Sequence, residues 1–518
     1  MAERAQPVSR WPGIGAATLV AALVLGCLLA VALRAEGGRG FGPADWAAIR
    51  FTIVQALLSA GFSVALAIPV ARALARRRFV GRGVLIVILG VPFILPVIVA
   101  VLGLLAVFGR AGWISSALGW IGMEPISIYG LHGVVLAHVF FNLPLATRLI
   151  LQGWQQIPAE QFRLAAQIGA DARGVWRLLE RPMLARVAPG VAAVIFAICL
   201  TSFAVALTLG GGPRATTIEL AIYQAFHFDF DLGRAALLSV VQIVVTCSAA
   251  LLALRWSRMD GFGGGLDRPV QRWDANTSAL RLVDTLVITL GALFLILPLA
   301  AVVLSGLAEL PRLPWVVWSA LLNSLSIAAL STIVLIAVAL PLAITIAGGS
   351  RAWGEMAGVL GLAVSPLVLG TGLFVMINPY LDPFALAIPV TALVNTVMAL
   401  PFALRVLVPP VREVMVTYGR LGLSLNMSGW PFLRQVLLPR LRPQLGFAAG
   451  LAAALSMGDL GVIALFADSE FATLPLQIYR LMGAYRMDAA AGAGLLLMLS
   501  ALTIFWMLDK GGRWHAED

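Results

Sequence analysis

Long apolar runs alternate with short polar segments along the whole chain. Most runs hold about 20 residues, the length that a helix needs to cross about 30 Å of hydrocarbon. The runs are continuously apolar, and only a helix satisfies its own backbone within one such run, so helices are predicted rather than barrel strands. Twelve spans are predicted, near residues 11–33, 51–74, 83–108, 130–152, 188–210, 234–256, 282–305, 321–346, 354–377, 384–408, 443–466 and 489–508. The fold class is therefore an all-α polytopic membrane protein with six spans in each half.

Composition supports a membrane location. The chain has 518 residues, of which 60% are hydrophobic and 12% are charged, and this is more apolar surface than one soluble core can bury. The first span follows Arg4 and Arg10, and this pattern resembles a cleavable signal peptide. Its apolar run is longer than the usual 7–15 residues, so we expect the span to be retained.

The basic residues are distributed unevenly between the two faces. If the N-terminus is cytoplasmic, 27 of the 36 Lys and Arg residues fall on the cytoplasmic side. This asymmetry predicts that both termini face the cytoplasm. It also explains the net charge of +11 without nucleic-acid binding.

Two polar, Arg-rich segments recur with one offset of 257 residues. Each lies between hydrophobic spans, and the matched pairs include Arg163 with Arg420, Leu164 with Leu421, Arg177 with Arg434 and Pro182 with Pro439. Such a register indicates an internal duplication. The predicted division is a first domain over 1–260 with a loop at about 153–187, a cytoplasmic linker over 261–281, and a second domain over 282–518 with a loop at about 409–442.

The loop pattern resembles the membrane subunits of binding-protein-dependent ABC importers. Their loop carries E-A-A, three residues, Gly, and then Pro thirteen residues later. The corresponding residues here are Arg163, Leu164, Ala165, Gly169 and Pro182 in the first copy, and Arg420, Leu421, Gly422, Asn426 and Pro439 in the second. Small residues let a short helix sit closely in a partner's cleft, and Gly or Asn tolerates the left-handed turn behind it.

The match departs from the family at its first position. Arg163 and Arg420 stand where the family has an acidic residue, so an ion pair with an arginine of the ATPase cannot form there. One such loop alone could be a surface amphipathic helix. Two such loops at equivalent positions favour the interpretation that they dock the ATPase over the interpretation as surface helices.

A narrower resemblance covers nearly the whole chain. The stretches 136–144, 164–169, 202–224 and 455–462 resemble the fused thiamine and thiamine-diphosphate importer permease of Gram-negative bacteria. The resemblance implies two fused six-helix type I ABC importer domains in the inner membrane. It also implies two copies of a cytoplasmic ABC ATPase, which use ATP and Mg²⁺, and a periplasmic thiamine-binding protein as partners. Fused ferric-iron permeases share the architecture and are the alternative within the class.

The motifs argue against other functions. There is no G-x-x-x-x-G-K-[ST] sequence, so no nucleotide is expected to bind to this chain. We expect no catalytic, cofactor or metal site, because the Cys and His residues form no spaced cluster. An ion-coupled secondary transporter would need several intramembrane acids, and Asp459 is nearly alone in the predicted spans.

Four polar residues are candidates for the translocation path. Asp459 stands opposite Ser202 by the 257-residue offset, and both follow the loops. A carboxylate there could pair with a cationic vitamin, or it could hold a locally broken helix near Gly458. Asn142 and Asn395 lie near helix-kinking prolines, where hydrogen bonding inside the bundle is the favoured alternative to ligand contact.

Overall fold

The computed structural model is built from helices. It describes residues 7–35, 41–90, 92, 94–212, 215–256, 272–274, 276–349, 364–466 and 471–514. Within these ranges the apolar runs predicted from the sequence are helical, which confirms the all-α fold class. Most of the predicted linker and part of the span near 354–377 lie outside the described residues.

The first half contains most of the short helices. Its elements are α1 (Trp11–Arg34), α2 (Pro43–Arg76), α3 (Arg82–Ile88), α4 (Val97–Phe108), α5 (Trp113–Trp120), α6 (Leu131–Gln155), α7 (Ala159–Gln167), α8 (Ala172–Val175), the π-helical turn η2 (Trp176–Glu180), α9 (Arg181–Leu200), α10 (Phe203–Leu209), α11 (Ile218–His227) and α12 (Leu232–Trp256).

The second half repeats the order with longer helices. Its elements are α13 (Ser278–Glu309), the 3₁₀ turn η4 (Leu310–Arg312), α14 (Trp315–Ala347), α16 (Pro366–Ile377), α17 (Ala387–Ser424), α18 (Trp430–Phe432), the π-helical turn η5 (Leu433–Leu437), α19 (Leu438–Met457), α20 (Gly461–Phe466), α21 (Leu474–Gly483) and α22 (Met487–Arg513).

Ten helical segments in the described part of the chain are long and apolar enough to cross a membrane. The other two predicted spans, near 354–377 and 443–466, are represented by α16, which has 12 residues, and by α19 with α20. The number twelve therefore stays a prediction.

Three spans predicted as continuous are interrupted. The span at 83–108 is wrong as one helix, because α3 ends at Ile88 and α4 begins at Val97 after Pro96. The spans at 188–210 and 443–466 also break, at Thr201–Ser202 and at Gly458–Leu460. Hydropathy could not reveal these breaks because the residues on both sides are equally apolar. The predicted end of the tenth span at 408 is also wrong, since α17 continues to Ser424.

The first helix of each half packs against the other half. Helix α1 contacts α14 and α16, and α13 contacts α2 and α4. Glycines make both crossings close: a side chain at Gly103 of α4 would overlap the backbone of Pro298 in α13, and one at Gly372 of α16 would overlap Cys27 in α1. Because α1 also contacts α12 and α13 also contacts α22, each of these two helices bridges the two halves.

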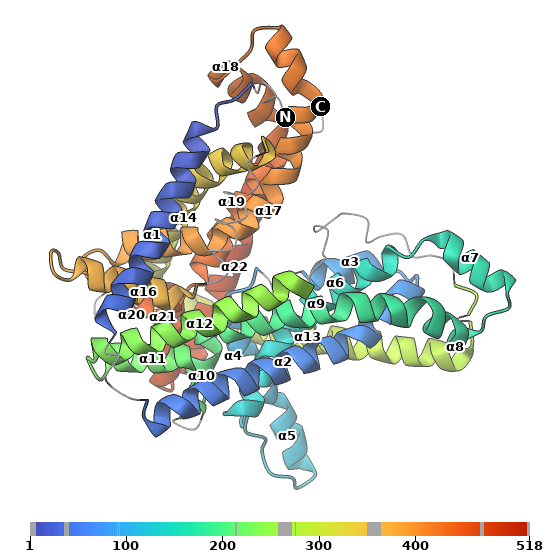
Figure 1. The fold of residues 1–518 in the computed structure, drawn as a ribbon. Helices are drawn as coiled ribbons and strands as arrows, with labels where there is room; N and C mark the ends of the chain where they lie inside the picture. Colours follow the sequence, from blue (N-terminus) through green and yellow to red (C-terminus); the bar gives the residue numbers. More distant parts are fainter. Residues whose placement is uncertain are drawn as a thin grey trace.

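Two arms diverge from a common base (Figure 1). One arm holds α2, α6, α9 and α13 and ends near α7 and α8, while the other holds α14, α17 and α19 and ends near α18. Helices α10, α11, α20 and α21 lie at the base where the arms meet. The two Arg-rich loops therefore lie at the separated ends of the molecule.

Candidate functional site: paired loops and buried polar groups

The two loops end their helices with the same turn. Gly169 has φ +71° and Asn426 has φ +55°. Ala170 N–H donates to Ala165 O at 2.9 Å, and Met427 N–H donates to Gly422 O at 2.7 Å. This bond from the second residue beyond the helix end, with the left-handed residue before it, defines a Schellman turn. The predicted left-handed turn is confirmed in both copies.

The same positions are exposed in both loops. Arg163 and Arg420 are exposed, and Leu164 and Leu421 are 60% and 54% exposed. One helical turn later, Ile168 and Leu425 are also exposed. The small residues Ala165 and Gly422 face inward, and a side chain at Gly422 would overlap the ring of Phe432. Each loop therefore presents an apolar pair beside an arginine.

A π-helical turn precedes each of the two prolines that are related by the 257-residue offset. The π-helical turns η2 and η5 are separated by the 257-residue offset, and Pro182 and Pro439 lie in the first turn of α9 and α19. A proline ring clashes with the carbonyl four residues earlier in a regular helix, and a wider turn relieves that clash. The proline boundary predicted from the sequence is therefore present in both halves.

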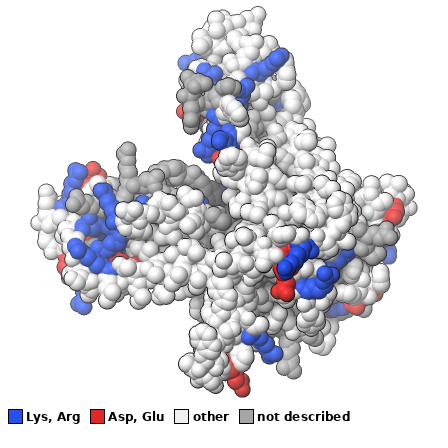
Figure 2. Space-filling model, turned by 180° about the vertical axis from the view of Figure 1, so that it is seen from behind, with Lys and Arg blue, Asp and Glu red and all other residues white. Residues whose placement is uncertain are grey.

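Basic side chains gather near the ends of both arms, as Figure 2 shows. The chain's N-terminal segment lies at the end of the second arm, where Gly429 N–H donates to Pro7 O at 2.6 Å. Helix α22 ends at the same place (Figure 1). The described ends of the chain thus lie beside the second loop, and which membrane face this is stays a prediction.

Two of the three interrupted spans, those broken at Thr201–Ser202 and at Gly458–Leu460, meet at the base of the arms. Ser202 precedes α10, and Asp459 precedes α20, where Gly461 N–H donates to Asp459 Oδ1 at 3.2 Å. Phe203 at the start of α10 lies against Gly461. The structure therefore brings the segments of Ser202 and Asp459 together. Asp459 Oδ1 holds the start of α20, while its Oδ2 has no hydrogen-bond partner among the described residues.

The two asparagines point between helices of their own halves. Asn142 Nδ2 donates to His138 O at 2.9 Å and to Cys199 Sγ at 3.4 Å. Asn395 Nδ2 donates to Ser456 Oγ at 2.9 Å. The acceptors Cys199 and Ser456 are equivalent by the 257-residue offset, whereas the two asparagines are not, because position 395 corresponds to His138. The favoured interpretation, hydrogen bonding inside the bundle, is confirmed for both residues.

Sequence reasoning missed a second buried acid. Glu219 lies in α11 with 0% of its surface exposed, and its carboxylate lies close to the side chains of Ser365 and Gln242. Glu219 lies between the predicted spans, so the expectation that Asp459 is nearly alone within them stays a prediction. Glu219 is the one acidic residue in the stretch 202–224, and that was the signal available in the sequence.

Sequence reasoning also missed a buried ion-pair cluster around Glu180 of η2. Glu180 is fully buried; Arg72 Nε donates to its Oε2 at 2.7 Å, and Arg272 Nη2 lies 2.9 Å from its Oε1. Trp154 Nε1 also donates to Oε1, at 3.3 Å. The equivalent residue in the second half is the buried Leu437. The sequence signal was that the first half has an acidic residue, Glu180, where the second half has an apolar one.

The cluster ties the end of the linker to the first loop. Arg272 Nε lies 2.7 Å from Asp274 Oδ1, and the guanidinium also covers the ring of Phe162 in α7 at 4.8 Å. Burial opposes ionisation of Asp274, but its hydrogen bonds and attraction to Arg272 outweigh burial and hold the pKa of Asp274 below its ordinary value. The pair therefore stays charged at neutral pH.

The geometry defines a class: a duplicated polytopic permease with two exposed, equivalent loops. No family model matches the chain. The thiamine transport system permease protein ThiP of Salmonella typhimurium is 40% identical over 541 residues, with 100% of both chains covered. ThiP of Escherichia coli is 41% identical over 539 residues, covering 98% of each chain. The chain therefore belongs to the family of thiamine ABC transport permeases.

A more distant similarity fits the duplication. The sulfate transport system permease protein CysW of Synechocystis is 26% identical over 235 residues, which covers 43% of this chain and 80% of that protein. The match covers most of that protein but less than half of this chain, as expected if two such units are fused. The domain boundaries at 260 and 282 stay predictions.

Proposed function

We propose that this chain is the membrane subunit of an importer that moves thiamine, its phosphates or both across the inner membrane. The relatives named as thiamine permeases support the substrate. The two exposed Schellman-capped loops support the mechanism, because nothing in the described fold covers their apolar side chains. An exposed apolar pair beside a charge is typical of a docking surface.

In this mechanism the loops bind two copies of a cytoplasmic ABC ATPase, and the chain itself binds no cofactor. ATP and Mg²⁺ act in the ATPases. When the ATPases close, the loops at the ends of the two arms move toward each other. The base of the arms then opens to the periplasmic side of the membrane. A periplasmic thiamine-binding protein delivers the vitamin there. The termini and both loops then face the cytoplasm.

The path is expected to pass between the two helix breaks. The segments of Ser202 and Asp459 meet at the base of the arms, and the carbonyls of an interrupted helix are available to polar groups in transit. Asn142 and Asn395 are excluded from the proposed path because their amide donors already serve bundle hydrogen bonds.

Reconstitution tests the function. Vesicles that contain the chain, its ATPase and the binding protein should accumulate labelled thiamine after ATP is added. A non-hydrolysable ATP analogue should give no accumulation. Ferric iron, offered with the same components, should not be taken up. Thiamine accumulation driven by a proton or sodium gradient without the ATPase would overturn the proposal.

A further inference from the structure

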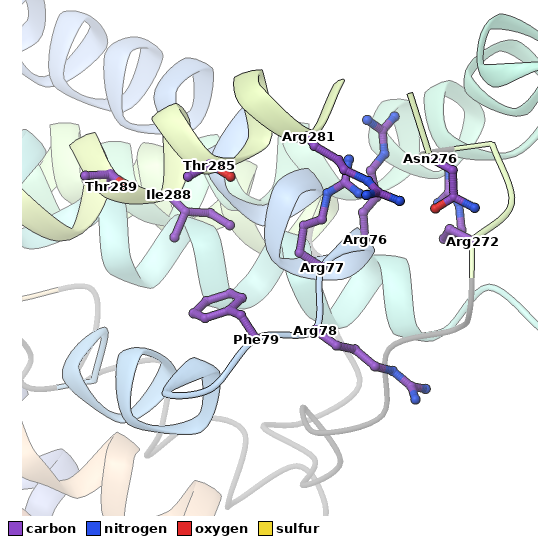
Figure 3. A pocket seen from close by; sticks show the side chains of 10 residues that line it. All are labelled: Arg76, Arg77, Arg78, Phe79, Arg272, Asn276, Arg281, Thr285, Ile288 and Thr289. Carbon is purple, nitrogen blue, oxygen red and sulfur yellow. The ribbon is translucent and has the colours of Figure 1, made fainter. Parts of the chain in front are cut away.

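An arginine-lined pocket lies beside the Glu180 cluster (Figure 3). It has a volume of about 690 Å³ and lies between the end of α2, the start of α13 and the end of the linker. Five arginines from these three segments line it: Arg76, Arg77, Arg78, Arg272 and Arg281. In Figure 3, Arg77 and Arg281 reach toward the same part of the pocket, whereas Arg78 extends in another direction.

The positive charge of this region exceeds its negative charge. The five lining arginines and Arg72 accompany three carboxylates, those of Glu180, Asp274 and Asp284. Asp284 Oδ2 lies 2.7 Å from Arg77 Nε, and Glu180 and Asp274 are held by Arg72 and Arg272. Among the described residues, arginines therefore outnumber carboxylates in this region even when Arg78 is left out of the count. Arg281 is exposed and forms no ion pair within the described part of the chain.

Buried donors in the pocket wall lack acceptors. Arg76 is only 7% exposed, and its Nε and Nη2 have no hydrogen-bond acceptor in the described structure. Its Nη2 lies 3.6 Å from Glu180 Oε2, which is an ion pair too long for a hydrogen bond. Arg77 Nη2 likewise lacks an acceptor there. Leaving buried charged donors unpaired is costly, and the oxygens of a bound anion would satisfy them.

The opposite wall of the pocket is partly apolar. Phe79 and Ile288 contribute it, with the hydroxyls of Thr285 and Thr289 from the same helix, α13. Helix α13 is one of the membrane-crossing segments, so this wall leads from the arginines toward the apolar part of the bundle. Basic pockets between membrane helices, with an apolar side, suit the head group of an anionic phospholipid.

We propose that this pocket binds the phosphate group of an anionic ligand, and the apolar wall favours an anionic phospholipid over a free phosphate compound. Guanidinium groups match phosphate oxygens in paired hydrogen bonds, and three chain segments supply them here. Bound phosphate would join α2 of the first half to α13 of the second half and to the linker. The pocket is distinct from the exposed side chains of the loops, although Arg272 connects its wall to Phe162 and Glu180 of the first loop.

Binding to the purified full-length chain tests the site. Native mass spectrometry in detergent would measure added phosphatidylglycerol, with phosphatidylcholine as the uncharged comparison. Thermal unfolding with pyrophosphate, at matched ionic strength, would measure a soluble source. We expect phosphatidylglycerol to bind and the double variant Arg77→Gln, Arg281→Gln to weaken binding about tenfold or more, because two charged donors are lost.

Matched variants distinguish binding at this pocket from a non-specific effect of the protein's positive charge. Arg110→Gln removes the same charge at an exposed residue outside the pocket and should bind like the wild type. Arg281→Gln alone alters an exposed residue and keeps the test valid if the double variant fails to fold. Stabilisation by pyrophosphate without lipid binding would assign a soluble phosphate ligand to the same site. Failure of the wild type to bind either probe, or equal binding by the Arg281→Gln variant, would overturn the proposal.

Discussion

Asp459 combines a structural contact with a free oxygen. Its Oδ1 accepts the N–H of Gly461 at the start of α20, and its Oδ2 has no partner in the described structure. Asn and Asp cap helices equally well, whereas Ala does not. The contact with Gly461 needs an oxygen acceptor at this position, which the side chain of Asn also supplies.

Two substitutions at Asp459 separate these roles. Asp459→Asn should keep both the abundance and thiamine uptake close to wild type, because the cap remains. Asp459→Ala should lower stability by about 1 kcal/mol through the lost cap. Abundance and thermal unfolding in detergent, together with uptake into vesicles, measure these effects.

The opposite result is expected if the negative charge of Asp459 is needed for transport. If the carboxylate contacts a cationic substrate, the Asn variant should remain folded and abundant but lose affinity or rate by about five- to 150-fold, since an ionic contact contributes about 1–3 kcal/mol. That result would move Asp459 from the helix cap to the substrate path.

The two loops show how far local sequence determines an element. Their Schellman turns require a residue that accepts positive φ, and Gly169 and Asn426 both do so. Around these turns the elements differ, because Pro158 precedes a separate α7 in the first half while α17 continues to Ser424 in the second. Equivalent docking surfaces are thus carried by a short helix in one half and by the end of a long helix in the other.

Substitution of the turn residue tests the docking element. Gly169→Arg should leave membrane insertion intact but strongly reduce ATPase association and vitamin-stimulated hydrolysis. An L-residue other than Asn or Asp costs about 1–2 kcal/mol in this backbone conformation, and the new side chain would face the partner. Co-purification of the ATPase and the hydrolysis rate are the measurements.

The second loop supplies the control. Gly169→Asn places the residue found at the equivalent position 426 and should preserve coupling. Unchanged stimulated hydrolysis in the Gly169→Arg variant would show that the segment 159–180 does not dock the ATPase.

The whole molecule is two arms joined by helices that contact both halves. Because α1 packs against α14 and α13 packs against α2, neither half can separate without losing its contacts with the first helix of the other. The loops remain far apart at the ends of the arms (Figure 1). In the proposed mechanism the arms pivot about this common base.

Distance measurements test that movement. Nitroxide labels at Gln167→Cys and Ser424→Cys, which are exposed equivalent positions, should move closer when the ATPase binds ATP. The partly exposed Cys247 would be replaced by Ser to avoid labelling, while Cys27 and Cys199 are buried. A distance distribution that stays the same with ATP, ATPase and binding protein would contradict the proposed closure. The chain without ATPase is the control.

Local properties of the chain predicted the helical class, the paired loops and the turns at Gly169 and Asn426. Hydrophobic runs and backbone preferences act over a few residues, so they are visible in sequence. Only the tertiary structure decided that α1 and α13 each contact both halves and that Glu180, Arg72 and Arg272 meet in one cluster. These residues are separated by up to 200 positions, and their contacts depend on how whole helices pack. The same packing decided that Asn142 and Asn395 bond within the bundle, because a polar residue in an apolar run can face either a path or a neighbouring helix.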